Sequence, residues 1–277
     1  MAIPDVKTDP RLTRFERLAV GIGAFLNERP GPKALQSLFH RHFGMRWVGY
    51  CTGNLLHVEG LDIVRRLAPP RGVLMCANHR SFFDQYAISC LVAREAHETW
   101  ARNISFPVRS GFFYESWAGV AVNLVIAGGA MYPPIFRDPA RADLNKRSLE
   151  RVAELLQAPG TVVGLHPEGT RGKGPDPYQL LPAQPGVGMV ALRSRATILP
   201  VWVNGLGNDF LAQIASNFRT GERRGQPIIV VIGEPVDLGP LAEGNPRPAL
   251  YKRVADRILD EIRRLGERER AIRASLR

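Results

Sequence analysis

The sequence has few cysteines and few acidic residues. Its three cysteines, Cys51, Cys76 and Cys90, are odd in number and include no CxxC pair, so they predict neither a disulfide framework nor a zinc site, and a reducing compartment is expected. Acidic residues number 26 against 37 lysines and arginines, which gives a formal net charge of +11. This balance favours an anionic partner. No module typical of nucleic-acid binding is present, so we expect a lipid surface or a phosphorylated substrate.

The sequence also lacks a long uninterrupted apolar run. The longest apolar-rich stretch, 112–131, is broken by Glu115, Asn123 and several glycines, whereas a membrane-spanning helix needs about 20 apolar residues with few charges. We predict a buried or interfacial helix there. The apolar patch at 18–26 is short and precedes no small-residue cleavage site, so no signal peptide is expected.

Strand-like and helix-like segments alternate after residue 53. Apolar segments predict strands at 54–60, 72–77, 161–166, 197–203 and 227–236. Helices are predicted at 82–94, 140–156, 187–195 and 248–275. The alternation predicts an α/β fold for residues 51–277, with a mixed, largely parallel sheet flanked by helices. In such sheets, ligands bind beyond the carboxyl ends of the strands.

Residues 1–50 predict an N-terminal helical hairpin, broken by the prolines and glycine of 29–32. The second helix carries an apolar stripe with basic residues beside it. The stripe consists of Leu35, Leu38, Phe39, Phe43 and Trp47, and the basic residues are Lys33, His40, Arg41, His42 and Arg46. Such a helix can lie on an anionic membrane. It can equally pack on the main domain, because amphipathicity does not distinguish lipid from protein core.

The segment CANHRSFFDQ, residues 76–85, places Asp84 five positions after His79 at a predicted strand-to-helix turn. One continuous helix or strand would separate these side chains, but a turn can fold the carboxylate back to the imidazole. A carboxylate on one ring nitrogen leaves the other free to accept a proton from a hydroxyl. The alternative is an ordinary helix start, in which Ser81 and Asp84 form a capping box.

A second motif, HPEGTRGKG at 166–174, follows the predicted strand 161–166. It combines a carboxylate, a hydroxyl, a guanidinium and flexible backbone in one turn. Arginine suits bidentate phosphate binding, and Gly169 lets the backbone approach a ligand closely. It is not a Walker loop, because Pro167 stands where the first glycine is required and Gly174 where Ser or Thr is required.

Together the two motifs resemble the NHxxxxD and FPEGTRS blocks of the glycerolipid acyltransferase superfamily, which includes the 1-acylglycerol-3-phosphate acyltransferases. The segment YPPIFRD, at 132–138, resembles the block between them. The segment LLPAQPGVGMVALRSRATILPV, at 180–201, resembles the stretch that follows. Order and approximate spacing agree from about residue 54 to residue 235.

The resemblance implies transfer of a fatty acyl group from acyl-CoA or acyl carrier protein to a hydroxyl of a lyso-phospholipid-type acceptor, with 1-acylglycerol-3-phosphate favoured. His79 would be the general base and Asp84 would orient it. The head group would be bound or framed by Arg137, Glu168, Gly169, Thr170 and Arg171, while Pro200 would shape the pocket. No metal, no cofactor beyond the co-substrate and no acyl-enzyme is implied. We expect a peripheral protein on the cytoplasmic face of a membrane.

Three positions depart from the family pattern. His166 replaces the usual phenylalanine, Gly172 the usual serine and Gln184 a common lysine, which leaves the acceptor open to another lyso-lipid or a glycolipid. His166 either titrates beside Glu168 or packs beneath the loop. Two other classes remain. One is a metal-assisted hydrolase with His79, Asp84, His166 and Glu168 as ligands, and the other is a non-catalytic lipid- or carrier-binding protein.

Two further expectations concern the acyl group. The cluster Phe112, Phe113, Tyr114 and Trp117 predicts either the lining of an acyl-chain tunnel or part of the core. Backbone N–H groups near the start of the helix after His79 are candidate donors to the oxyanion.

Overall fold

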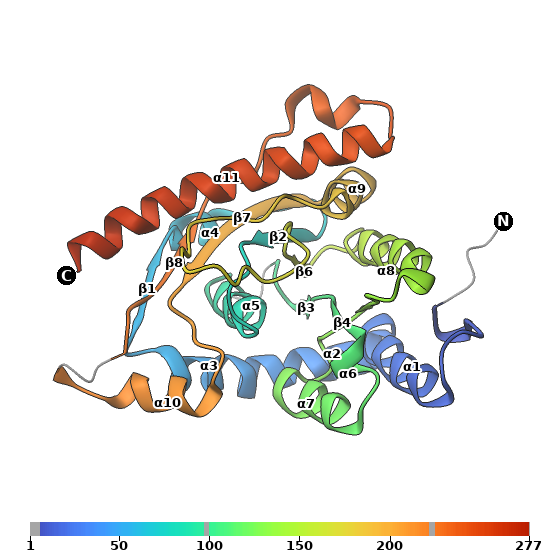
Figure 1. Ribbon diagram of the computed structural model, residues 1–277, viewed down its shortest axis with the longest axis horizontal. Coiled ribbons are helices and arrows are strands. Elements are labelled where there is room, and N and C mark those ends of the chain that lie inside the picture. The colour runs from blue at the N-terminus through green and yellow to red at the C-terminus, as the bar shows by residue number, and fades with distance from the viewer. Residues whose placement is uncertain (1–5, 97–99, 222–224, 277) are drawn as a thin grey trace.

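A six-stranded mixed sheet forms the centre of the protein (Figure 1). The computed structural model describes residues 6–96, 100–221 and 225–276. The strand order is β1-β8-β7-β2-β6-β3, and neighbouring strands are parallel except β7 and β8. The strands are β1 (Leu56–Glu59), β2 (Val73–Ala77), β3 (Asn103–Ser105), β6 (Thr161–Leu165), β7 (Thr197–Asn204) and β8 (Ile228–Ile232). The predicted α/β class with a largely parallel sheet is confirmed.

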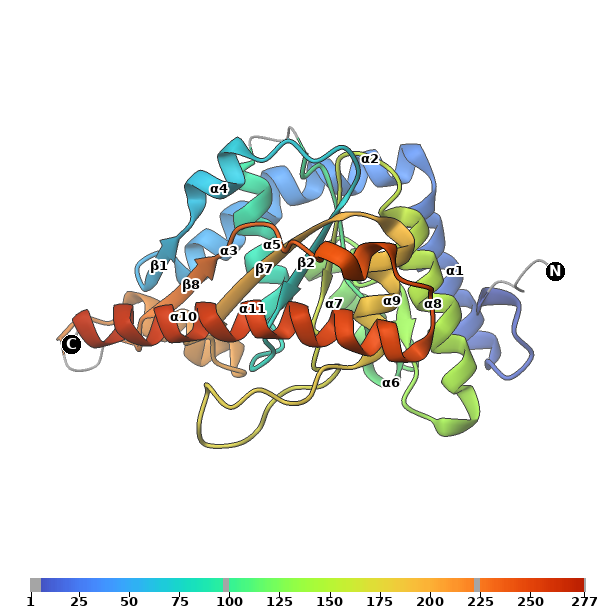
Figure 2. The ribbon, with the colours of Figure 1, turned by 90° about the horizontal axis from the view of Figure 1, so that it is seen from above.

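Helices cover both faces of this sheet. They are α1 (Arg14–Glu28), α2 (Pro30–Phe39), α3 (Met45–Thr52), α4 (Leu61–Arg66), α5 (Asp84–Glu95), α6 (Ser110–Phe113), α7 (Trp117–Ala127), α8 (Ala142–Leu155), α9 (Pro185–Ser194), α10 (Phe210–Phe218) and α11 (Pro248–Ser275). In Figure 1, α9 and α11 lie above the sheet, whereas α1, α2, α3, α7 and α10 lie below it. Figure 2, seen from above, shows α11 as one long helix across the molecule, and it packs on α9, β7 and β8.

Strand β2 illustrates how the alternation of side chains builds two cores. Val73 and Met75 pack with α4 and α5 in one apolar cluster. Leu74 and Cys76 pack with α8, α9 and α11 in the other. All five residues of β2 are buried, as expected for a parallel strand covered on both faces. The central strand that precedes His79 is therefore held rigidly from both sides.

The predicted element boundaries mostly agree with the structure, and the differences have local causes. The predicted helix at 112–131 is wrong as a single element, because Ser116 accepts a hydrogen bond from the Gly119 N–H and starts α7 anew. The predicted helix at 82–94 begins at Asp84. Strand β3 and the pair β4 (Val108–Arg109) and β5 (Pro134–Ile135) were not predicted, since two or three residues show no periodicity. Within the described residues, no helix has both the length and the apolar character needed to cross a bilayer.

The N-terminal helices break at Arg29, where the backbone is extended and Pro30 starts α2. A π-helical turn, His40–Gly44, then leads into α3, which runs past residue 50 to Thr52. The amphipathicity of α2 is inverted. Its buried residues are Lys33 and Gln36, whereas Leu35 and Leu38 are exposed. Of the predicted apolar stripe, Leu35, Leu38 and Phe43 are therefore exposed, whereas Phe39 and Trp47 are half-buried.

Lys33 joins the N-terminal helices to the edge of the sheet. Its Nζ donates to Asn27 Oδ1 at 2.8 Å, to Gln36 Oε1 at 2.6 Å and to the Ile104 carbonyl at 2.7 Å. Burial lowers the pKa of Lys33 to about 7. Three acceptors match the three donors of an ammonium group, so these contacts oppose the effect of burial and favour the charged form.

Replacing Lys33 with methionine tests this connection. The Lys33→Met variant leaves buried amide and carbonyl oxygens without their donor, so we expect the free energy of unfolding to fall by about 2–4 kcal/mol. Urea denaturation measures this change. The control, Lys252→Met, removes an exposed lysine of α11 that pairs with Asp256 and should change the stability by less than about 0.5 kcal/mol. Equal effects of the two variants would contradict the role of Lys33.

Candidate active site

The site begins where β2 ends. The Asn78 side chain continues the pairing with β7, because its Nδ2 donates to the Val203 carbonyl at 2.9 Å and its Oδ1 accepts from the Val203 N–H at 2.8 Å. His79 is the next residue and leaves the sheet at its carboxyl edge. This is the position at which parallel sheets bind ligands.

The turn after His79 brings Asp84 to the imidazole. Oδ2 of Asp84 lies 3.3 Å from His79 Nδ1 and accepts hydrogen bonds from the N–H groups of Arg80 at 2.7 Å and Ser81 at 2.6 Å. The Phe83 N–H donates to Ser81 Oγ at 3.2 Å. The same carboxylate thus contacts the imidazole and caps the start of α5, so the two interpretations of this motif are compatible.

Burial changes the pKa values of both His79 and Asp84. Burial lowers the pKa of His79 to about 3, and the positive charges of Arg171 and Arg137 add to this effect. Burial raises the pKa of Asp84 to about 6, against the effect of its backbone hydrogen bonds. At neutral pH the imidazole is therefore neutral and the carboxylate ionised. With Nδ1–H directed to Asp84, the lone pair resides on Nε2.

Glu168 fastens the second motif to the first. Its Oε1 accepts from the His79 N–H at 2.8 Å, and its Oε2 accepts from the Leu181 N–H at 2.7 Å. The Gly172 N–H donates to the His79 carbonyl at 2.9 Å. Glu168 is buried, which favours framing of the head-group site over direct contact with a head group. Gly169 has a φ of +66°, a conformation that favours glycine.

Two predicted arginines come together on the outer side of this loop. Arg137 Nη2 donates to Thr170 Oγ1 at 2.8 Å. Arg171 Nη1 donates to Asn208 Oδ1 at 2.7 Å, and its guanidinium lies 3.5 Å from the centre of the Phe82 ring. The two guanidinium groups and a hydroxyl thus lie close to the dyad, in an arrangement that suits a phosphate.

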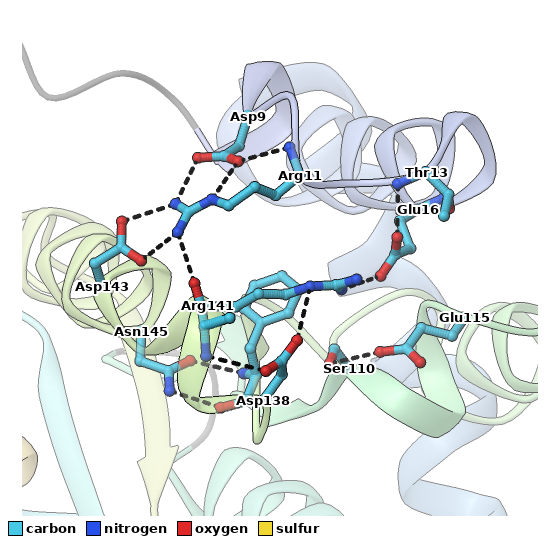
Figure 3. Close-up of polar contacts among 12 residues, drawn as sticks. Asp9, Arg11, Thr13, Glu16, Ser110, Glu115, Asp138, Arg141, Asp143 and Asn145 are labelled. Carbon is cyan, nitrogen blue, oxygen red and sulfur yellow. Dashed lines mark hydrogen bonds and ion pairs between the residues drawn. The ribbon is translucent and has the colours of Figure 1, made fainter.

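The segment that carries Arg137 is tied to the N-terminal region, as Figure 3 shows. The Asn145 side chain accepts from the Phe136 N–H and donates to the Phe136 carbonyl, both at 2.7 Å. Arg11 pairs with Asp143 at 2.7 Å, and Arg141 pairs with Glu16 of α1. These contacts hold the backbone at residue 136, next to Arg137, in a fixed position.

His166 stacks directly on His79. The ring centres are 3.8 Å apart and the planes differ by 7°, and His166 Nδ1 lies 3.0 Å from the Ala77 carbonyl. The packing of His166 against His79 favours the expectation that His166 is packed beneath the loop. Burial lowers its pKa to about 3, and the neighbouring His79 contributes in the same direction.

Several expectations do not fit the structure. Pro200 lies in the buried middle of β7, opposite Cys76, so any effect on the shape of the pocket would be indirect and stays a prediction. Tyr114 is buried, whereas Phe112 and Trp117 are exposed, so the aromatic cluster does not enclose a tunnel. The N–H groups of residues 80–84 all have acceptors within the protein, which removes them as free oxyanion donors.

The ligand set proposed for a metal-assisted hydrolase does not converge. Both oxygens of Glu168 accept backbone hydrogen bonds, and the two histidine rings lie face to face instead of directing nitrogens to one point. Among the residues that the structure describes, no group of three His, Cys, Asp or Glu side chains is arranged to hold a metal ion. This arrangement gives the hydrolase alternative no set of ligands.

Three residues of the site were not predicted. Arg80 donates to the Gly174 carbonyl, and a Cβ on Gly172 would lie 2.8 Å from Arg80 Nη1, the end of a flexible side chain, so nothing in the structure explains glycine in place of the usual serine. Phe82 and Asn208 hold Arg171. Arg80 and Phe82 lie within the first motif and could have been found there. Asn208 has no signal in the sequence, because it belongs to a loop far along the chain.

Comparisons with known proteins agree with the fold and the motifs. The structure is similar to the crystal structure of the 1-acyl-sn-glycerophosphate acyltransferase PlsC from Thermotoga maritima, with a TM-score of 0.52 and 18% identity, covering 92% of this chain and 88% of that chain. A search of curated proteins finds no match. The model of the family described as Acyltransferase matches residues 56–204, a range that contains both motifs and more than half of the chain. The protein therefore belongs to the acyltransferase family, as its motifs predicted.

Proposed function

We propose that this protein transfers a fatty acyl group from acyl-CoA or acyl carrier protein to a hydroxyl of a lyso-phospholipid-type acceptor, with 1-acylglycerol-3-phosphate as the favoured acceptor. The observation that carries this proposal is the His79–Asp84 pair at the carboxyl edge of the sheet, with Arg137 and Arg171 beside it. A solved protein of similar fold is described as an acyltransferase of 1-acyl-sn-glycerophosphate, which supports this choice of acceptor.

The reaction needs one proton acceptor. Nε2 of His79 takes the proton of the acceptor hydroxyl while that oxygen bonds to the carbonyl carbon of the thioester. When the tetrahedral intermediate collapses, the carbon–sulfur bond breaks, and the imidazolium returns the proton to the leaving thiolate. A thioester is already activated, so general base catalysis of about 100- to 10,000-fold is the main contribution expected from the dyad.

Asp84 makes His79 suitable for this task. Its Oδ2 lies 3.3 Å from Nδ1, a long contact of the kind that tightens when charge develops on the imidazole. The ionised carboxylate then stabilises the imidazolium. The stacked His166 ring holds the imidazole from its face and restricts its rotation. Together these neighbours fix which nitrogen faces the substrate.

The two arginines would bind the acceptor phosphate and so place its hydroxyl near Nε2. Gln184 stands where a lysine is common in the family, so one cation is missing from the head-group side. This difference favours a second acceptor class, which is another lyso-lipid or a glycolipid. A non-catalytic lipid-binding protein is the other alternative. It differs in a testable way, because binding would not require the imidazole of His79.

The inverted helix α2 supports a peripheral place on an anionic membrane. Its exposed residues include Leu35 and Leu38, and the neighbouring residues Arg41 and Arg46 are also exposed. Apolar side chains flanked by cations suit the interface of an acidic bilayer. We place this surface on the cytoplasmic face, where the acyl donors would be available.

The decisive experiment offers the purified protein acyl-CoA or acyl-carrier-protein donor with a panel of lyso-lipids. Mass spectrometry should detect a diacyl product, with the highest turnover for 1-acylglycerol-3-phosphate. The His79→Ala variant should lose at least about 100-fold in kcat while keeping its thermal unfolding transition. A His79→Ala protein with normal turnover would exclude the proposed base. A wild-type protein that binds lyso-lipids without forming product would favour the binding protein.

Arg171→Ala tests the phosphate site. Removing a guanidinium that binds a phosphate should raise KM for 1-acylglycerol-3-phosphate by about 10- to 100-fold, with a much smaller change for monoacylglycerol, which lacks the phosphate. The control is Arg264→Ala, which removes an exposed arginine of α11 paired with Glu261 and should leave both KM values unchanged. A similar rise in KM for both acceptors would show that Arg171 does not recognise phosphate.

His166→Phe tests the effect of the buried ring on pH dependence. An unfolded histidine binds a proton below about pH 6.5, whereas His166 in the fold stays neutral to about pH 3. The unfolded state therefore binds more protons, and this residue lowers stability as the pH falls below about 6.5. His166→Phe should reduce that loss by up to about 1.4 kcal/mol per pH unit.

Urea unfolding at several pH values between neutral and mildly acid measures this slope. His42→Gln is the matched control, because His42 is exposed and its removal should leave the slope as in the wild type. If stability fell with pH in parallel for the wild type and His166→Phe, His166 would be protonated in the folded protein as it is in the unfolded one.

A further inference from the structure

Helix α10 buries two polar side chains and exposes two large apolar ones. Leu211 is 75% exposed and Phe218 is 49% exposed. These two residues are seven positions apart and so share one face of the helix. Gln213 and Asn217 are four positions apart on another face and are 8% and 3% exposed. A helix that packs on a protein core in water normally has the opposite arrangement.

The buried polar residues of α10 make hydrogen bonds to neighbouring segments. Gln213 Oε1 accepts from the Gly207 N–H at 2.9 Å. Asn217 donates to the Tyr50 carbonyl at 2.7 Å and accepts from the Asn54 N–H at 2.9 Å. These bonds hold α10 against α3 by polar contacts. The helix is thus fixed in place without burying its apolar face.

An aromatic row connects α10 to the N-terminal helices. The rings of Phe43 and Trp47 are stacked with centres 6.0 Å apart, those of Trp47 and Tyr50 with centres 6.1 Å apart, and Tyr50 contacts Phe218 of α10 at 4.9 Å. Phe43, Tyr50 and Phe218 are exposed. Aromatic side chains in this position suit the boundary between water and lipid. Figure 1 shows α10, α3 and α2 on the same lower side of the molecule.

The charge of these segments complements an anionic bilayer. Residues 30–58 and 210–221 contain no acidic residue. Arg46 of α3 and Arg219 after α10 are both exposed. Cationic side chains near an anionic lipid surface are attracted to it. Apolar, aromatic and cationic side chains therefore occur together on one surface without a carboxylate from these segments.

The amino end of α10 lies at the acceptor-binding arginine. Asn208, two residues before the helix, accepts from Arg171 Nη1 at 2.7 Å and from the Phe82 N–H at 3.1 Å. Ser81 Oγ donates to the Gly207 carbonyl at 2.7 Å. The loop that starts α10 is thereby attached to the turn that carries His79. A bilayer in contact with α10 would lie beside the place where a lipid acceptor must enter.

We propose that α10 is a second lipid-contacting element, distant in sequence from residues 1–50, which rests on an anionic bilayer through Leu211 and Phe218 beside the acceptor site. This inference rests on the proposed function for the role of Arg171 in binding the acceptor. The contact with lipid itself stands on the exposure and charge of the helix. It makes α10, together with α2 and α3, one continuous surface for lipid.

The first test is vesicle flotation of the full chain with vesicles of phosphatidylcholine and phosphatidylglycerol. Leu211→Asp should weaken binding by about tenfold or more, because a buried leucine contributes about 1.5–3 kcal/mol. The control is Leu276→Asp, an exposed leucine directly after α11, which should bind as the wild type does. Undiminished binding of Leu211→Asp, or an equal loss in both variants, would overturn the proposal.

A second measurement reports contact directly. The three native cysteines are buried, so an environment-sensitive fluorophore attached to Leu211→Cys labels this position selectively. Its emission should shift to the blue on adding the same vesicles and should be quenched by brominated lipid chains. An unchanged emission would overturn the proposal and would point to a protein partner for this face.

Measurements of activity distinguish the proposed function from the proposed lipid contact of α10. Leu211→Asp should raise the apparent KM for an acceptor embedded in vesicles and leave that for a short-chain soluble acceptor unchanged. If the wild type transfers acyl groups while the probe at position 211 stays in water, this inference alone fails. If the probe enters lipid and no acceptor is acylated, the proposed function fails and the lipid contact remains.

Discussion

The site depends on the use of two buried carboxylates as acceptors for backbone N–H groups. Asp84 binds the N–H groups of Arg80 and Ser81, and Glu168 binds those of His79 and Leu181. Burial alone raises the pKa of both acids, so each needs its hydrogen bonds to remain ionised. The first carboxylate folds the turn onto α5, and the second joins that turn to the neighbouring loop. The imidazole is positioned only when both are in place.

The sequence predicts the central strands and the long helices well because their patterns extend over several turns or several pleats. Helix α11 agrees with its predicted range, 248–275, and β2 and β6 agree to within one residue. The missed strands have one cause, which is that short elements carry no period. Strands β3, β4 and β5 depend on partners from distant segments. The split between α6 and α7 depends on a single capping serine, Ser116.

At the site, the sequence predicts which residues gather but not which way each side chain faces. A carboxylate in such a turn can contact a ligand or the backbone, and Glu168 contacts the backbone. Pro200 has the right place in the order of motifs, yet the register sets it opposite Cys76 inside the sheet. Asn208 contacts Arg171 because β7, which precedes Asn208, ends at the same edge of the sheet as β2. Tertiary contacts of this kind leave no local trace in a sequence.

The inverted helices favour the lipid interpretation, one of the two that amphipathicity left open for the N-terminal segment. A helix packed on a protein in water would gain about 1.5–3 kcal/mol for each large apolar side chain that it buried. Helices α2 and α10 forgo this gain at Leu35 and Leu211 and instead bury polar groups such as Lys33 and Asn217, whose desolvation must be offset by hydrogen bonds. Two segments far apart in sequence share this arrangement on one side of the molecule. A neighbour less polar than water would recover the gain at both, and a bilayer that carries the acceptor is such a neighbour.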